Sequence, residues 1–124
     1  MSASWKDVVD CAAGLPGVTE GTSYGTPALR AGKAFLTRLR PEDGSIVIKI
    51  PIDERDMRIE AAPDIYFITD HYKAWPAVLV RLAKLSKAEL KALIARAWRE
   101  AAPRKLVAAY DGISPLPPRR RAKP

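Results

Sequence analysis

The sequence has no asparagine and no glutamine, and it has only one cysteine and one histidine among its 124 residues. The single Cys11 excludes an internal disulfide framework and most cysteine-based metal sites. The single His71 excludes a metal centre built from several histidines, so we expect no metal and no cofactor. Without amide side chains, the chain also lacks the usual bidentate reader of adenine in DNA.

Long hydrophobic runs are missing too. No apolar run reaches the roughly 18 residues that a membrane helix needs, and residues 1–10 have no basic start followed by an apolar stretch, as a secretory signal would. Apolar residues make up 48% and charged residues 28%, which is typical of a globular domain rather than a disordered chain. We therefore expect one cytoplasmic domain with no membrane contact.

The chain also lacks recognisable motifs of catalytic sites. The spacing of Gly25 and Gly32 does not fit a phosphate-binding loop. Any nucleophilic site would need His71 as its base and Cys11 or Ser23 as its nucleophile, and the sequence places neither beside it. We therefore expect no catalytic residues, and we predict that the protein is not an enzyme.

Basic residues are concentrated at one end of the chain. The formal net charge is +7, yet residues 1–83 hold 10 basic and 11 acidic side chains, whereas residues 84–124 hold 11 basic and 3 acidic ones. A basic C-terminal third favours an anionic partner such as DNA. The alternative is that these charges only keep a helix face and the tail solvated and soluble, without binding a partner.

Apolar spacing and turn residues predict the elements of the first half. A helix capped by Ser4 is expected over residues 5–13, and residues 18–25 fit either a loop or a short irregular strand. Short connections join three strand-like segments into an antiparallel meander. In the middle one, simple alternation predicts Phe35, Thr37 and Leu39 on one face. The three segments are residues 26–31, 34–40 and 45–50.

The second half predicts two helices and two strands. Asp53 is the expected cap of a helix over 54–61, with Met57 and Ala61 inward. Ser86 and Glu89 form a capping box before a helix with one apolar stripe, which Pro103 kinks or restarts. The stripe is Leu90, Leu93, Ile94, Ala97, Trp98 and Ala101, and the two strands are residues 65–69 and 75–82.

The resulting order is α-β-β-β-α-β-β-α, which is an α+β fold. We expect a five-stranded antiparallel sheet with the helices packed on one face. Residues 1–110 form the domain, and residues 111–124 are a Pro/Arg-rich tail with too little apolar surface to fold.

Several segments, taken in order, resemble the MmcQ/YjbR family of small bacterial proteins over about residues 4–108. The resemblance implies an α+β fold like that of secretion chaperones, described as a double-wing arrangement. It also implies DNA binding, and it carries over no catalytic residues. The segments are Leu15-Pro16-Gly17-Val18-Thr19-Glu20, Gly25-Thr26-Pro27-Ala28-Leu29-Arg30, Lys33-Ala34-Phe35, His71-Tyr72-Lys73-Ala74-Trp75 and Ala102-Pro103-Arg104-Lys105-Leu106.

Three functions remain open at this point. The first is DNA binding with weak sequence preference, through phosphate or shape contacts by the C-terminal helix and tail, with Lys73 and Trp75 as further contacts. The second is a protein-interaction or chaperone-like module that uses the open face or edge of the sheet, as a homodimer or with another protein. The third is a small-molecule site around His71, Tyr72 and Trp75. The basic residues of the first are Lys87, Lys91, Arg96, Arg99, Arg104, Lys105, Arg119, Arg120 and Arg121.

Overall fold

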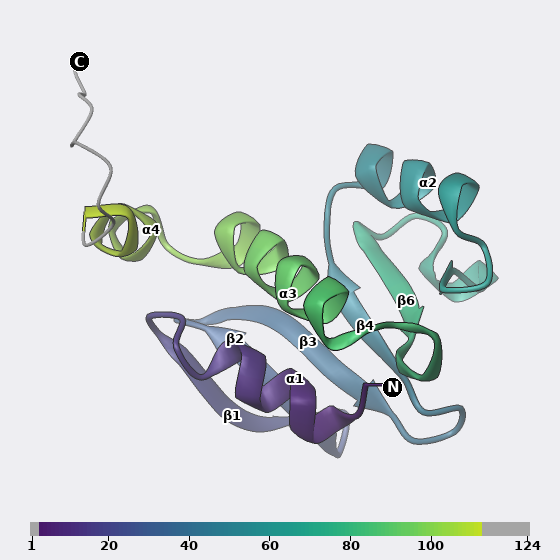
Figure 1. Cartoon of the computed structure of the whole chain (residues 1–124), viewed down its shortest axis with the longest axis horizontal. Helices are drawn as coiled ribbons and strands as arrows, with labels where there is room; N and C mark the ends of the chain where they lie inside the picture. The colour runs from purple at the N-terminus through teal and green to yellow at the C-terminus, as the bar shows by residue number, and fades with distance from the viewer. Residues whose placement is uncertain (1–2, 113–124) are drawn as a thin grey trace.

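A six-stranded antiparallel sheet forms the centre of the structure, a computed structural model that describes residues 3–112 (Figure 1). The strands lie side by side in the order β1-β2-β3-β4-β6-β5. The α+β class and the antiparallel sheet are confirmed. The elements, in chain order, are α1 (Trp5–Ala12), β1 (Val18–Ser23), β2 (Thr26–Ala31), β3 (Ala34–Arg40), β4 (Ser45–Lys49), α2 (Ile52–Ala61), β5 (Tyr66–Phe67), the short 3₁₀ helix η1 (Asp70–Tyr72), β6 (Ala77–Arg81), a second 3₁₀ helix η2 (Leu82–Lys84), α3 (Lys87–Ala101) and α4 (Arg104–Gly112).

The sheet has one strand more than predicted, because residues 18–23 form β1 and pair with β2 along their whole length. The turn between them consists of Tyr24 and Gly25, with φ of 53° and 75°. Two consecutive residues at positive φ are typical of a tight type I′ hairpin. The apolar pattern of β1 is weak because four of its six residues are exposed at the edge of the sheet.

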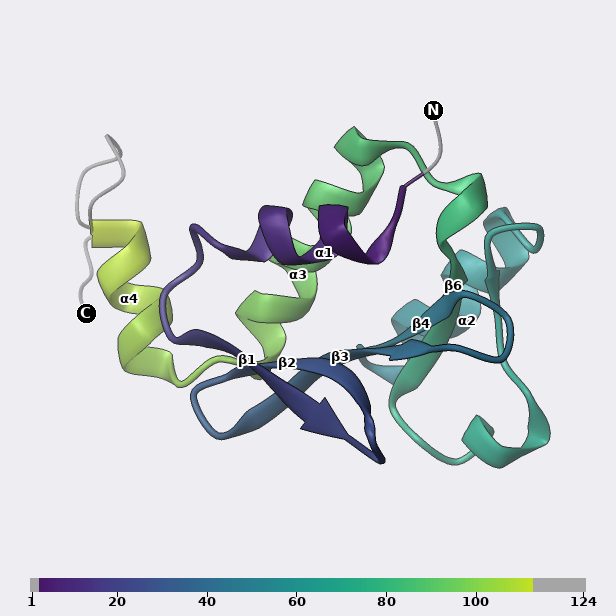
Figure 2. The same cartoon turned by 90° about the horizontal axis from the view of Figure 1, so that it is seen from below.

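Helices α1 and α3 cover one face of the sheet (Figure 2). The predicted stripe of α3 is confirmed as core: Leu90, Leu93, Ile94, Ala97 and Trp98 are all buried. The indole Nε1 of Trp98 donates a hydrogen bond of 2.9 Å to the carbonyl of Pro16, which ties α3 to the turn after α1. Within residues 3–112, no helix is both long enough and apolar enough to cross a membrane.

The capping boxes at Ser4 and Ser86 are confirmed, but the prediction for α2 was wrong in two respects. The helix begins at Ile52 directly after Pro51, and Asp53 makes no capping hydrogen bond. Met57 is 68% exposed and Ala61 is exposed as well, and the buried residue of α2 is Arg55. Hydropathy assigned the wrong residue to the interior because the buried guanidinium has carbonyl partners that only the tertiary fold supplies.

Helix α4 begins after Pro103 and packs against the end of the core through Leu106, Val107 and Tyr110. Gly17, at φ 77°, lies so close that a Cβ there would overlap Leu106. The helix extends past the predicted domain end to Gly112. The predicted tail contacts Arg119, Arg120 and Arg121 lie outside the described residues.

Candidate functional site

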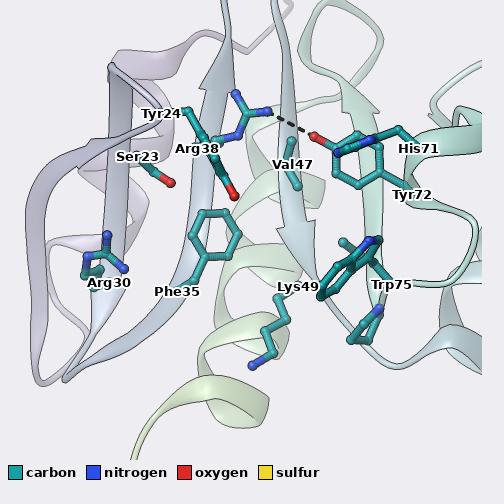
Figure 3. Close-up of a pocket in the computed structure, with 12 residues that line it drawn as sticks. Ser23, Tyr24, Arg30, Phe35, Arg38, Val47, Lys49, His71, Tyr72 and Trp75 are labelled. Atoms are coloured by element: carbon teal, nitrogen blue, oxygen red, sulfur yellow. Dashed lines mark hydrogen bonds between the residues drawn. The ribbon is translucent and has the colours of Figure 1, made fainter.

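The sheet face opposite α1 and α3 carries a pocket of about 730 Å³ (Figure 3). Strands β2, β3, β4 and β6 form its floor, while the β1–β2 turn and the segment from η1 to β6 form its two sides. Its lining residues are Ser23, Tyr24, Arg30, Phe35, Arg38, Val47, Lys49, His71, Tyr72, Trp75, Pro76 and Ala77.

Strand pairing explains why these side chains share one face. Residues directly opposite each other in an antiparallel pair point to the same side of the sheet. Arg38 pairs with Val47, and Val47 pairs with Leu79 of β6. Lys49 pairs with Ala77 in the same way. The cations therefore stand beside small or apolar residues on the open face.

A β-bulge in β3 brings Phe35 and Arg38 to this face together. Leu29 pairs with Thr37 and Arg30 pairs with Phe35, so Leu36 has no partner across the strand pair. Both Leu36 and Thr37 are fully buried on the helix side. The prediction that Phe35 shares a face with Thr37 and Leu39 was therefore wrong, because the extra residue of a bulge reverses the alternation.

One buried side chain holds the aromatic side of the pocket in place. Arg55 of α2 is 4% exposed. Its Nη1 donates to the carbonyls of Tyr72 at 3.1 Å, Lys73 at 3.3 Å and Trp75 at 2.9 Å. Its Nε donates to Asp56 at 2.9 Å. Three carbonyls of one turn are thus satisfied by one guanidinium, which fixes the backbone that carries Tyr72 and Trp75.

Arg38 connects the floor of the pocket to this aromatic side. Its Nη2 donates to the hydroxyl of Tyr72 at 3.0 Å, and this hydrogen bond joins β3 to η1 (Figure 3). Its guanidinium also lies 5.5 Å from the centre of the Tyr24 ring, within the range of a cation–π contact. His71 meets the Tyr72 ring edge-on at 5.0 Å.

The chemistry of the lining is aromatic and cationic. Four rings, those of Tyr24, Phe35, Tyr72 and Trp75, surround an otherwise apolar floor. Tyr24 is 91% and Trp75 is 61% exposed, so both offer open ring faces. Among the lining residues, all of which the structure describes, no Asp or Glu balances the charges of Arg30, Arg38 and Lys49.

The structure brings together the three residues of the predicted small-molecule site. His71, Tyr72 and Trp75 all line the pocket, whereas the side chain of Lys73 is exposed and is not part of the lining. Sequence analysis missed the strand residues of the floor and Arg55. The floor residues could have been noticed, because Arg38 and Lys49 are charged residues within otherwise apolar strands. The bulge in β3 concealed that they point to the same face.

The predicted basic residues of α3 lie on the other side of the sheet, and several are already paired. Arg96 contacts Glu54 at 2.7 Å and Glu100 at 3.1 Å, and Arg99 contacts Asp111 at 2.7 Å. Their hydrogen bonds to Glu100 and Asp111 raise the pKa of each guanidinium. Lys87 lies 3.6 Å from Asp7. Lys91, Arg104 and Lys105 are exposed.

The candidate nucleophiles and metal ligands are dispersed. Cys11 lies in α1 on the helix side, where burial raises the pKa of its thiol. Ser23 and His71 lie on opposite sides of the pocket, and no hydrogen bond joins these two described residues (Figure 3). Over residues 3–112 no three His, Cys, Asp or Glu side chains form a group that could hold a metal ion.

Comparisons with known proteins identify the family of this chain and a solved structure with a similar fold. The family model described as YjbR matches residues 13–100. Uncharacterized protein Rv2570 of Mycobacterium tuberculosis (strain H37Rv) and Uncharacterized protein Mb2600 of Mycobacterium bovis are each 34% identical over 123 residues, covering 87% of this chain and 95% of theirs. The crystal structure of Deinococcus radiodurans protein DR2400, with the family-model domain DUF419, matches with a TM-score of 0.66 at 15% identity, covering 78% of this chain and 77% of that one. This last likeness is one of fold.

Proposed function

The chain belongs to the YjbR family, and we propose that it is a ligand-binding protein whose site is the pocket on the open face of its sheet. The observation that carries this proposal is the pocket itself. Its volume of about 730 Å³ lies within the roughly 300–1,000 Å³ typical of small-molecule sites, which are also mainly apolar and aromatic. The expected ligand has a flat apolar part that packs on Phe35, Val47 and Trp75.

Binding rather than catalysis is the function proposed. General acid–base chemistry needs a titratable group within hydrogen-bond reach of the group that it serves. His71 instead packs its ring against Tyr72, and the lining supplies no carboxylate to orient it. The hydrogen bond between Arg38 and Tyr72 spans the lining and has a structural purpose, since it joins β3 to η1.

Saturation-transfer NMR with two ring probes tests the proposal. The probes are naphthalene-2-methanol and naphthalene-2-carboxylate, and the full chain is used. At about 0.3 kcal/mol per non-hydrogen atom, a probe of this size binds with a Kd on the order of 1 mM, which this method detects. Trp75→Ala removes an exposed ring from the pocket, and Met57→Ala removes an exposed apolar side chain elsewhere.

We expect the wild-type protein and Met57→Ala to bind at least one probe, and Trp75→Ala to lose most of the signal. Absence of a signal from both probes with the wild-type protein would overturn the proposal. Equal loss in Trp75→Ala and Met57→Ala would overturn it as well, because the binding would then not be located in the pocket.

Single-stranded DNA is a second candidate ligand, and one observation favours it. Tyr24 and Trp75 expose their ring faces beside the cations of the same surface. Unpaired bases stack on such rings at about 1–3 kcal/mol each, and lysine or arginine contacts the phosphates. Bases in a duplex are already stacked on each other, so this surface favours single strands. With no asparagine or glutamine in the chain, weak sequence preference is expected.

Fluorescence anisotropy separates this surface from the originally predicted one on α3 and the tail. A labelled oligothymidylate and a labelled duplex are titrated at about 50 and 200 mM salt with the full chain, a chain ending at Gly112, and Trp75→Ala. Binding of single strands that survives the truncation and weakens in Trp75→Ala supports the open face. Binding that disappears with the truncation assigns the affinity to residues 113–124 and rejects the open face.

A further inference from the structure

We propose that the natural ligand of the pocket is a small organic anion that accepts hydrogen bonds, with its charged group at Arg30 and Lys49 and its flat ring over Phe35 and toward Trp75. This inference rests on the proposed function and adds to it the chemical class and the orientation of the ligand. It concerns a part of the pocket that the hydrogen bonds of the protein itself leave open.

The first step is the charge of the lining. Arg30, Arg38 and Lys49 come from three adjacent strands and point to one face, and the lining includes no Asp or Glu. Arginine stays charged at any ordinary pH, and an exposed lysine does so at neutral pH. An apolar cavity with uncompensated cations favours a ligand that brings negative charge of its own.

The second step is that the three cationic side chains differ in how many of their donors already form hydrogen bonds within the protein. Arg38 donates from Nη2 to the hydroxyl of Tyr72 at 3.0 Å and from Nη1 to the carbonyl of Leu39 at 3.3 Å. Arg30 has one long contact of 3.5 Å, to the carbonyl of Thr22. Lys49 is exposed, and its side chain forms no ion pair or hydrogen bond with the described residues 3–112. Arg30 and Lys49 therefore have donors to spare for a ligand.

The third step is where these two cations stand. In Figure 3, Arg30 and Lys49 lie at the end of the pocket away from the Arg38–Tyr72 hydrogen bond, on either side of Phe35. Trp75 stands beside Lys49 and faces the same end. A ring placed on Phe35 between these groups has its charged substituent near the two cations, and this gives the ligand one orientation.

The fourth step is the kind of hydrogen bonding available. Guanidinium and ammonium groups donate and cannot accept, and hydroxyl groups do both. The lining has no amide and no carboxylate side chain; its polar groups are these cations, the indole N–H of Trp75, His71 and the hydroxyls of Ser23, Tyr24 and Tyr72. Donors on a ligand would find fewer partners here than acceptors, because only the hydroxyls and His71 can accept, and a buried donor without a partner costs binding free energy. A ring with a carboxylate or phosphate monoester fits this lining better than a sugar or an amine.

Four probes with the same ring test this inference in the full chain. They are naphthalene-2-carboxylate, 2-naphthyl phosphate, naphthalene-2-methanol and 2-(aminomethyl)naphthalene, and their affinities are measured by NMR titration at about 50 mM salt. We expect one or both anions to bind at least 5-fold tighter than the alcohol, and the cation to bind no better than the alcohol. The carboxylate and phosphate arms identify which anionic group the site prefers.

Three variants locate the charged group. Lys49→Met and Arg30→Met are each expected to lower the affinity for the anions about 3-fold or more while leaving that for the alcohol unchanged. Lys91→Met removes an exposed lysine from α3 on the other side of the sheet and is the matched control, with no change expected. Circular dichroism confirms that each variant is folded.

The outcomes separate this inference from the function on which it rests. If the alcohol binds as tightly as the anions, the anionic class is wrong and the ring-binding pocket stands. If Lys91→Met weakens the anions as much as Lys49→Met, the preference is a general effect of net charge and the orientation is wrong. If no probe binds, the proposed function and this inference both fall.

Discussion

At the scale of single residues, the pocket depends on a side chain that does not line it. The guanidinium of Arg55 lies beneath the turn and satisfies three carbonyls of residues 72–75. The sequence could not show this, because Arg55 stands in a run of charged residues that reads as a solvated helix face. Its burial follows from where β6 and η1 place those carbonyls, which is a tertiary fact.

Replacing this guanidinium is therefore expected to cost both stability and binding. In Arg55→Met the carbonyl of Lys73 loses its donor, whereas those of Tyr72 and Trp75 keep the backbone N–H groups of Trp75 and Ala77 as donors. An acceptor left unsatisfied costs about 1–3 kcal/mol. We expect a loss of about 2–3 kcal/mol in the free energy of unfolding, measured by urea denaturation, with weaker binding of the naphthalene probes. Met57→Ala, on the exposed side of the same helix, is the control. A free energy of unfolding within about 0.5 kcal/mol of the wild-type value would mean that the turn at residues 72–75 keeps its conformation without Arg55.

Gly17 and Gly44 form a matched pair for a second prediction. Both have positive φ, 77° and 73° respectively, but a Cβ on Gly17 would overlap Leu106 of α4 whereas one on Gly44 would meet nothing within 4 Å. Left-handed backbone costs a non-glycine residue about 1–2 kcal/mol, and forced overlap costs about 1–3 kcal/mol more.

Gly44→Ala is thus expected to lower the free energy of unfolding by about 1 kcal/mol, and Gly17→Ala by clearly more. Thermal denaturation of the two variants side by side measures the difference. Equal destabilisation would show that the side chain of Leu106 turns away from residue 17 at little cost.

At the scale of elements, local signals predicted the starts of α1 and α3 and failed at the start of α2 and at the bulge. The capping boxes were predictable because Ser4 with Asp7 and Ser86 with Glu89 act within four residues of each other. The faces of β3 were not, because a β-bulge depends on how β2 pairs with it. A single unpartnered residue, Leu36, decides whether Phe35 lies in the core or in the pocket.

The capping box of α3 predicts a dependence of stability on pH. The hydrogen bond that the backbone N–H of Ser86 donates to the carboxylate lowers the pKa of Glu89. A group whose pKa is lower in the folded protein than in the unfolded chain stabilises the fold above its unfolded pKa. That stabilisation decreases as the pH falls below about 4.3, the ordinary value for glutamate, and is gone below the folded pKa.

Glu89→Gln keeps an acceptor at this position and removes the titration. We expect the urea midpoint of the wild-type protein to fall more between pH 6 and pH 3 than that of Glu89→Gln. Asp7, whose pKa the backbone hydrogen bond from Ser4 lowers in the same way, is unchanged in both proteins and cancels in the comparison. Parallel pH profiles would contradict a contribution from the box of α3.

At the scale of the whole molecule, the fold was easier to predict than the site. Strand lengths, short turns and one strong amphipathic helix determine an α+β fold with an antiparallel sheet. The site combines the β1–β2 turn, four strands and the turn after η1. It lies on the sheet face opposite the one that α1 and α3 cover (Figure 2). Charge counting along the chain favoured α3, because it cannot reveal that Arg96 and Arg99 are already paired with carboxylates.

The C-terminal helix α4 is predicted to contribute to the stability of the fold but not to binding in the pocket. Helix α4 lies at one end of the structure, beyond α3 (Figure 1), and contributes none of the lining of the pocket. It covers the core with Leu106, Val107 and Tyr110, and the Tyr110 ring packs against Trp98 at 5.1 Å. Its Asp111 accepts two hydrogen bonds from Arg99, at 2.7 and 3.1 Å.

A chain that ends at Ala102 loses all of these contacts, whereas one that ends at Gly112 keeps them. Half-burial of three large side chains is worth about 2–4 kcal/mol, and 1 kcal/mol shifts the Tm of a domain of this size by about 4–8 °C. We expect the Gly112 chain to melt with the full chain, and the Ala102 chain to melt at least 8 °C lower. Below that Tm, both should bind the naphthalene probes as the full chain does, because the pocket is built from residues 23–77. Loss of probe binding by a folded Ala102 chain would mean that α4 controls the open face through the core, and the pocket could then no longer be treated as independent of the C-terminal helix.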